Sequence, residues 1–431
     1  MSRVRRAGAY LLLGAALALI AASTLTPTGA ASGRLPVAWC LTCGPNWLSD
    51  AISNVALFVP LGVALAFVGM GYGNALLVGA GLSLAVELLQ YMGTPSGRTP
   101  ALSDWLTNSL GTLIGAALVS ARATLLLPSR PIARRLLSLW TLTVGAVGLV
   151  SSWLLSSASP SRGPTNPVAV SALPFTPGYG WYSANPDSGL VNGVRISHRG
   201  NGPIIAEMAR TDTVRLSVLV RGRDARRFTV PILYVHAPGE QRAYVVLGQR
   251  GTSAVVRLAM KARRYGLVAP ELALHNVFAP DARPVSSSVR LDASIAYGSM
   301  SLSAREDSPD RPVRRITLDV TPGIGWALIQ GVVRVDSDTA PLATALWLLF
   351  WFVPGGIWTV RAGAYTLGTA RAVAVSIVWA LLMIGLTDAG AAAFAIQPLR
   401  WWDTLLAVLG SALGAALPLR QDRPILRPSP S

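Results

Sequence analysis

Eight apolar runs dominate both ends of this chain, and they restrict the fold more than any other feature. A membrane-spanning helix needs about 20 mostly apolar residues. Of the 431 residues, 52% are hydrophobic and only 13% are charged, against about 25% charged in soluble proteins. We predict an α-helical polytopic membrane protein with spans at Ala7–Leu25, Ala51–Met70, Ala75–Tyr91, Asp104–Ala121, Leu136–Leu155, Leu342–Val360, Ala372–Leu386 and Trp401–Leu419.

The arginines orient these helices, because basic residues collect in the cytoplasmic loops of membrane proteins. With the N-terminus inside, twelve arginines fall in cytoplasmic segments and three in short outer loops. The cytoplasmic ones are Arg3, Arg5, Arg6, Arg122, Arg130, Arg134, Arg135, Arg361, Arg371, Arg420, Arg423 and Arg427, and the outer ones are Arg34, Arg98 and Arg400. We expect both termini in the cytoplasm. The first run exceeds the roughly 7–15 apolar residues of a signal peptide, so we expect it to be retained.

A segment of different composition, residues 156–338, separates the fifth and sixth runs. Alternating or β-branched stretches recur in it, such as Thr213–Val220, Tyr244–Leu247 and Ile316–Val320. Turn residues punctuate the segment about every 8–12 residues, which is typical of an all-β sandwich. The number of preceding helices places this segment outside the cell. We therefore predict an extracytoplasmic, jelly-roll-like β-sandwich between the fifth and sixth helices.

Charge and cysteine content narrow the choice of partners. The net charge is +17, which suits anionic lipid surfaces or cell-wall polymers. No nucleic-acid-binding motif accompanies the charge, so we expect no nucleic-acid partner. Cys40 and Cys43 are the two cysteines, whereas a zinc site needs four ligands. We predict a local disulfide or an inert pair, with no metal and no cofactor.

Polar side chains interrupt three neighbouring runs at one depth. Within a run they lie three or four residues apart, which places them on one helix face. A charge in the bilayer core costs roughly 3 kcal/mol or more, so Glu87 in its apolar run is a functional candidate. We predict one ligand-binding site near the outer leaflet, formed by Asp50, Asn54, Glu87, Gln90, Arg98, Asp104 and Asn108. Its catalytic candidates are Glu87, Asp104 and Arg98.

These residues also have structural explanations, which the sequence leaves open. Asp50 and Asp104 stand at predicted helix starts, where an aspartate caps free backbone N–H groups. The two asparagines serve equally well as hydrogen-bonding contacts between helices. Glu87 has Arg98 as its obvious counter-ion, and a buried ion pair is a sufficient structural role.

Two patterns of the first membrane region return near the C-terminus. Phe58–Gly62 returns as Phe352–Gly356, and the Asp and Gly spacing of Asp104–Leu118 returns in Asp403–Leu417. We interpret the last three helices as a degenerate second copy that lacks a match for Glu87; chance similarity of glycine-rich helices is the alternative. The repeated residues that we predict to be structural, with small residues allowing close helix contact, are Pro60, Gly62, Gly111 and Gly115.

These motifs resemble the VanZ-like membrane family over about residues 39–118. The resemblance rests on Asp50-x-x-x-Asn54 with Phe-Val-Pro-Leu-Gly, Ser83-x-x-x-Glu87-Leu-Leu-Gln90 with Arg98, and Asp104-x-x-x-Asn108-x-x-Gly111-x-x-x-Gly115. Members are small bacterial envelope proteins, and the name comes from a protein associated with resistance to teicoplanin-type glycopeptides. The resemblance implies that the seven polar residues are the family signature, without implying a reaction. The β segment resembles, more weakly, the concanavalin A-like lectin/glucanase sandwich. We see no paired carboxylates for hydrolysis there.

The predicted organisation is a membrane region at 1–155 with a VanZ-like unit at 39–121, a β-sandwich at 156–338, a second membrane region at 339–419 and a cytoplasmic tail at 420–431. We expect an inner-membrane protein that contacts membrane lipid, binds a cell-wall glycan or lipid-linked precursor, and affects glycopeptide susceptibility. One alternative is a membrane enzyme acting on an isoprenoid or phospholipid head group, with Glu87 or Asp104 as general acid–base and Arg98 as anion clamp. Another is a transporter, since such proteins often contain duplicated units.

Overall fold

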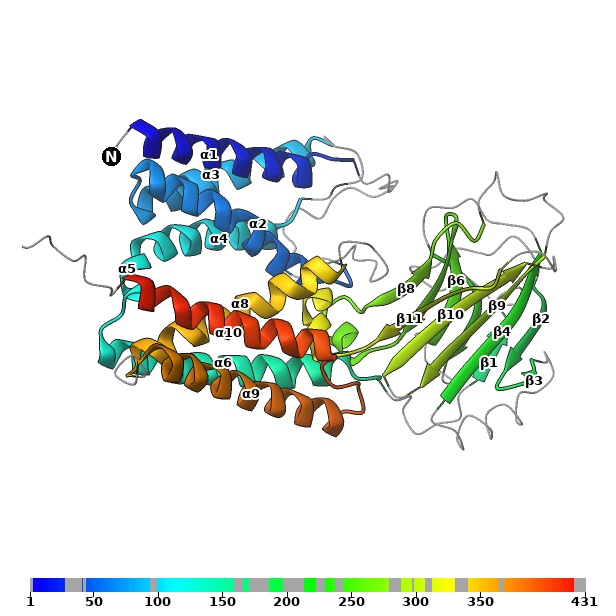
Figure 1. Cartoon of the computed structure of the whole chain (residues 1–431). Helices are drawn as coiled ribbons and strands as arrows, with labels where there is room; N and C mark the ends of the chain where they lie inside the picture. Colours follow the sequence, from blue (N-terminus) through cyan, green and yellow to red (C-terminus); the bar gives the residue numbers. More distant parts are fainter. Residues whose placement is uncertain are drawn as a thin grey trace, which may run out of the picture.

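The computed structural model describes residues 3–27, 41, 44–93, 98, 100–158, 166–169, 186–196, 213–221, 229–236, 243–278, 288–296, 298–306, 312–329, 340–363 and 368–421. Its helices lie on one side and its strands on the other (Figure 1). Each predicted apolar run is helical. The helices are α1 (Arg3–Thr24), α2 (Trp47–Val68), α3 (Tyr72–Tyr91), α4 (Leu102–Ser120), α5 (Arg122–Leu126), α6 (Arg130–Leu155), α8 (Ala340–Arg361), α9 (Thr369–Ala393) and α10 (Trp401–Gln421).

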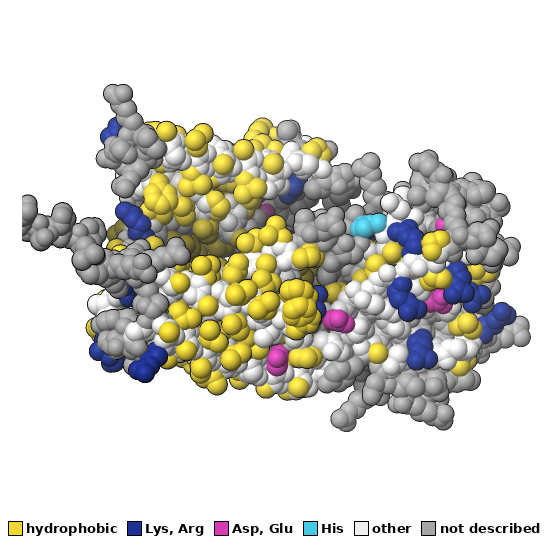
Figure 2. Space-filling model, in the orientation of Figure 1, with side chains coloured by type: hydrophobic (Ala, Val, Ile, Leu, Met, Phe, Trp, Pro, Cys, Tyr) yellow, Lys and Arg dark blue, Asp and Glu magenta, His cyan; other side chains and the backbone are white. Residues whose placement is uncertain are grey.

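Six helices among the described residues are long and apolar enough to cross a membrane: α1, α2, α3, α6, α8 and α9. The chain is therefore a multi-pass membrane protein, as its composition predicts. The helices form two groups, α1 to α4 and α6 with α8 to α10 (Figure 1). Apolar side chains cover the helical surface, which is recessed between the groups (Figure 2). Such a surface suits hydrocarbon rather than water.

Helices α2 and α4 pack with backbone directly against backbone. A Cβ added to Gly62 would lie 2.0 Å from the carbonyl oxygen of Thr112, and one added to Gly115 would lie 2.1 Å from that of Val59. No side chain fits at these distances, so small residues permit the close approach. Along this one contact lie the predicted structural residues Gly62, Gly111 and Gly115. Pro60, the fourth, lies inside α2.

The second helix group repeats this contact between α8 and α10. A Cβ added to Gly356 would lie 2.0 Å from the carbonyl oxygen of Ser411, and one added to Gly414 would lie 2.1 Å from that of Val353. The counterparts in the first group are Gly62 with Thr112 and Gly115 with Val59. The packing thus follows the register of the sequence repeat, residue for residue.

The β domain is a sandwich of two antiparallel sheets that share one apolar core. One sheet has the order β1-β5-β6-β7-β8 and the other β11-β10-β9-β4-β2-β3. In β4, Leu216, Val218 and Val220 are buried while the residues between them are more exposed; this period of two is that of a strand with one face in the core. The strands are β1 (Asn166–Ala169), β2 (Pro186–Val191), β3 (Val194–Arg195), β4 (Thr213–Arg221), β5 (Val230–His236), β6 (Ala243–Arg250), β7 (Ser253–Leu258), β8 (Glu271–Leu274), β9 (Ser288–Ala296), β10 (Ser299–Glu306) and β11 (Arg314–Asp319).

The sandwich rests on the helices through two short 3-10 helices, η2 (Lys261–Tyr265) and η4 (Pro322–Leu328). Ser49 in the first turn of α2 is fully buried in this junction. Its Oγ donates to the carbonyl of Leu328 at 2.8 Å and accepts the backbone N–H of Val268 at 2.8 Å. The backbone N–H of Ser49 also donates to the carbonyl of Gly266 at 3.1 Å. These bonds fix the β domain against the end of α2.

Candidate functional site

The predicted polar residues gather where α2, α3 and α4 approach the sandwich, and Asp104 is at their centre. The Asn54 side chain of α2 lies near the Asp104 carboxylate, and Asp104 Oδ1 accepts the Ser103 hydroxyl at 3.3 Å. The Asp104 charge interacts electrostatically with Asp50, Arg98 and Glu87. Asp50 is exposed, while Asn54 and Asp104 are half-buried. The structure therefore brings these five residues from three helices and one loop into a single cluster.

Glu87 anchors the backbone that leads into α4. Its side chain is 8% exposed, and its Oε2 accepts the backbone N–H of Ala101 at 2.8 Å. Ala101 is the residue directly before the first turn of α4. Because the first N–H groups of a helix have no partner within the helix, the carboxylate satisfies a donor that would otherwise be buried and free. Glu87 thus has a structural role beside any role in binding.

Arg98 is not the counter-ion of Glu87, contrary to the expectation from sequence. Its Nη2 donates to the carbonyl of Ser23 at 2.6 Å and its Nε to that of Thr26 at 3.4 Å. Gln90 Nε2 reaches the neighbouring carbonyl of Thr24 at 3.5 Å. The last carbonyls of α1 lack partners within that helix, so they attract these donors. The sequence reasoning missed α1 as a part of this site.

Asn108 lies one helical turn below Asp104 on the same face of α4. Its Nδ2 donates to Ser83 Oγ of α3 at 3.0 Å. The side chain is 2% exposed, and its Oδ1 has no hydrogen-bond partner. An unsatisfied buried acceptor costs about 1–3 kcal/mol. The Asn108 side-chain oxygen is therefore an acceptor without a hydrogen-bond donor in this cluster.

Capping does not explain the two aspartates. Helix α2 begins at Trp47, three residues before Asp50, and α4 begins at Leu102, two residues before Asp104. The residues in the N-cap positions are Asn46 and Ala101, and neither helix has a side-chain capping bond. Both carboxylates consequently lie inside the first turn, where the helix dipole favours a negative charge.

Hydrogen-bond acceptors outnumber donors in this cluster. Across the part of the chain that the structure describes, no basic side chain lies within the 4.0 Å of an ion pair from Asp50, Glu87 or Asp104. With Asn108 Oδ1, the site presents three carboxylates and a free amide oxygen. Such a site is suited to a ligand that supplies hydrogen-bond donors.

The second helix group has a counterpart of Glu87, contrary to the expectation of a decayed copy without one. Asp388 near the end of α9 accepts the backbone N–H of Leu399 at 2.8 Å, just before α10. This is the contact that Glu87 makes with Ala101 before α4. The connection between the helices has a different length in the two groups, so the spacing in sequence concealed the equivalence.

The bond to Ala101 makes a direct prediction for stability. Glu87→Ala leaves a buried N–H without an acceptor, and we expect the free energy of unfolding to fall by about 1–3 kcal/mol. Glu87→Gln keeps an acceptor oxygen, so we expect a clearly smaller loss. Thermal unfolding of the purified full-length variants measures both. Equal losses in the two variants would mean that the charge, rather than this bond, holds the segment.

The fold and the cluster define a multi-pass membrane protein with a polar site at the end of a four-helix unit. Residues 12–126 match the VanZ/LLP1 family, so the chain carries a VanZ-like segment, as the motifs predict. The match includes α1 from residue 12 onward, which the motif resemblance left out. Searches of curated proteins and of solved structures find no match. The predicted pair Cys40 and Cys43 lies outside the described residues.

Proposed function

We propose that this protein is a VanZ-like protein of the bacterial cell envelope that binds a cell-wall glycan or a lipid-linked precursor at the outer membrane surface. The observation that carries the proposal is the acceptor-rich cluster around Asp104, which has no ion-pair partner among the described residues. Sugar hydroxyl groups are donors that carboxylates bind well. The site lies at the end of apolar helices, where a lipid would present its head group.

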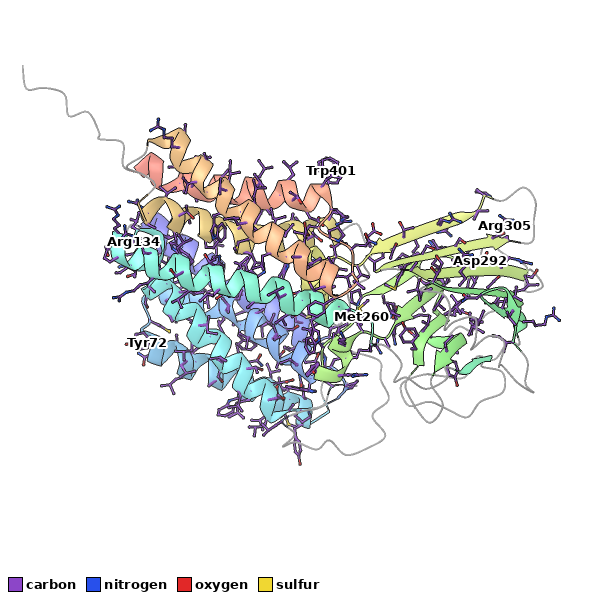
Figure 3. All side chains as sticks on the ribbon, turned by 90° about the horizontal axis from the view of Figure 1, so that it is seen from below. Tyr72, Arg134, Met260, Asp292, Arg305 and Trp401 are labelled. Atoms are coloured by element: carbon purple, nitrogen blue, oxygen red, sulfur yellow. The ribbon has the colours of Figure 1, made fainter. Side chains whose placement is uncertain are left out.

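We propose eight membrane spans, with both termini in the cytoplasm and the β domain outside. The support for α4 and α10 as spans is that each packs closely against a helix long enough to cross a membrane, α4 against α2 and α10 against α8. Basic side chains gather at the helix ends away from the sandwich (Figure 2), which fits a cytoplasmic end. Arg134 is at that end, and Trp401 is at the end near the sandwich (Figure 3). Trp401 stacks on Trp402 at 3.5 Å between ring centroids, and exposed tryptophans suit the membrane interface.

Binding is better supported than head-group chemistry. The enzyme alternative needs Arg98 as a clamp for an anion, but this guanidinium donates to the carbonyls of α1. We propose that the sandwich, with its six-stranded and five-stranded sheets, is of the concanavalin A-like type and adds a second glycan contact. A change in glycopeptide susceptibility would follow if the bound precursor were also the target of the antibiotic.

A deletion strain complemented with variants tests the proposal. We expect the wild type to restore glycopeptide susceptibility and the profile of cell-wall precursors, and Asp104→Asn to restore at most about a tenth of the effect, because it weakens charge-assisted hydrogen bonds. Asp403→Asn makes the same substitution at the equivalent position of the second unit and serves as the matched control. The membrane abundance of each variant is measured in parallel. Full rescue by Asp104→Asn at normal abundance would reject the cluster as the working site.

A further inference from the structure

The equivalent positions of the second helix group are occupied by the protein itself. Asp50 precedes Gly62 by twelve residues, and Thr344 precedes Gly356 by the same twelve. Asp104 precedes Thr112 by eight residues, and Asp403 precedes Ser411 by the same eight. Since the glycine contacts fix this register, Thr344 and Asp403 mark the second site, as Asp50 and Asp104 mark the first.

The occupant of the second site is η4 of the β domain. Trp326 Nε1 donates to Thr344 Oγ1 at 3.0 Å, and both side chains are buried. Gly323 packs so closely on Asp403 that a Cβ would lie 2.9 Å from Oδ2. Asp403 is 1% exposed, and Arg400 pairs with it at 3.2 Å. The space between the starts of α8 and α10 is thus filled by the Trp326 ring, which is neutral and has a single N–H donor, and by the closely packed backbone at Gly323.

The first site has the same helix register, but its marking residues are more exposed. Asp50 is exposed and Asp104 is half-buried, whereas Thr344 and Asp403 are both buried. The Oδ1 of Asn108, one helical turn further along α4 from Asp104, is buried and lacks a donor. The contacts of η4 with α2 go instead to Ser49 and Ser53 on the adjacent face of that helix.

We propose that the first site seats a neutral, donor-bearing ring, the pyranose of a glycolipid head group, in the place that the Trp326 ring holds in the second site. This inference rests on the proposed function and names the class of ligand. Ring hydroxyl groups donate to Asp50, Asp104 and Asn108 Oδ1, which are acceptors. Three carboxylates outnumber the one cation of the cluster, Arg98, which forms no ion pair with them among the described residues; the excess negative charge repels an anionic head group, so a phosphate is the wrong class of ligand.

Lipid enrichment around the full-length protein tests the class. The protein is reconstituted in phosphatidylcholine nanodiscs with one of three probes: monoglucosyl diacylglycerol, phosphatidic acid or stearylamine. Lipid that co-purifies with the protein is counted by native mass spectrometry. We expect enrichment of the glucosyl lipid, reduced at least about tenfold in Asp104→Ala, as expected for the loss of hydrogen bonds to a charged group. Asp319→Ala, on the exposed strand β11, is the control with unchanged enrichment.

The outcomes separate this inference from the proposed function. Asp104-dependent enrichment of phosphatidic acid or stearylamine in preference to the glucosyl lipid would overturn the assignment of the ligand as a pyranose. It would still support a site for a lipid head group. No Asp104-dependent enrichment of any probe would overturn this inference, whereas full rescue of the deletion strain by Asp104→Asn is the result that overturns the proposed function. Because Asp104→Ala also removes the neighbour of the Asn54 side chain, Asn54→Ala is measured too; it keeps the carboxylate, and we expect a loss of less than tenfold. Thermal unfolding of both variants detects a loss of fold.

Discussion

Gly62→Ala is expected to destabilise the first membrane unit by about 3 kcal/mol, the upper end of the usual cost of overpacking. The added Cβ would lie 2.0 Å from the backbone carbonyl oxygen of Thr112 and 2.9 Å from the backbone nitrogen of Ala116. A flexible side chain can rotate away from such a clash, but a helix backbone cannot. Helix α4 must therefore move away from α2. The lowered melting temperature of the purified protein in detergent measures the effect.

Two further alanine variants make this prediction specific. Gly81 on α3 has no atom within 4 Å of an added Cβ, and alanine favours a helix over glycine. We expect Gly81→Ala to leave the melting temperature unchanged or to raise it. Gly356→Ala meets the carbonyl of Ser411 at 2.0 Å, so we expect a loss similar to that of Gly62→Ala. A melting temperature equal to wild type in Gly62→Ala would contradict the backbone contact between α2 and α4.

Ser49→Ala is expected to weaken the junction between the β-sandwich and the first membrane unit. The substitution removes two buried hydrogen bonds, one from the Val268 N–H and one to the Leu328 carbonyl. These two groups also bond to each other at 3.2 Å, so each keeps one partner. At about 0.5–1.5 kcal/mol net for each lost hydrogen bond, the expected cost is about 1–3 kcal/mol. Faster hydrogen exchange of the Val268 amide in the full-length protein reports the loss, because this amide then keeps only its longer bond to the Leu328 carbonyl.

Ser53→Ala is the natural comparison, four residues further along α2. Ser53 Oγ makes one bond, to the carbonyl of Ile329 at 3.1 Å, and the side chain is half-buried. We expect a cost of about 1 kcal/mol and no change at Val268. Faster exchange at Val268 in Ser53→Ala, or unchanged exchange in Ser49→Ala, would show that Ser49 does not hold the junction.

The sequence alone determined where the helices lie and which residues share a depth. Hydrophobic length and helical periodicity are local properties, so the predicted span from Asp104 to Ala121 differs from α4 by only two residues at its start. Alternation of the helices then places Asp50, Glu87 and Asp104 at one end. The repeat was also readable, since the same glycine spacing is needed wherever two helices meet backbone to backbone.

The tertiary structure decided which groups pair. Arg98 bonds to Ser23, 75 residues away in sequence, rather than to the nearer Glu87. Ser49 bonds to Leu328 across 279 residues. Periodicity relates residues within one helix and carries no information on such distant partners, which depend on which backbone groups the packed helices and strands leave unsatisfied. For the same reason, the equivalence of Asp388 with Glu87 became visible only when both carboxylates were found on the backbone N–H before the next helix.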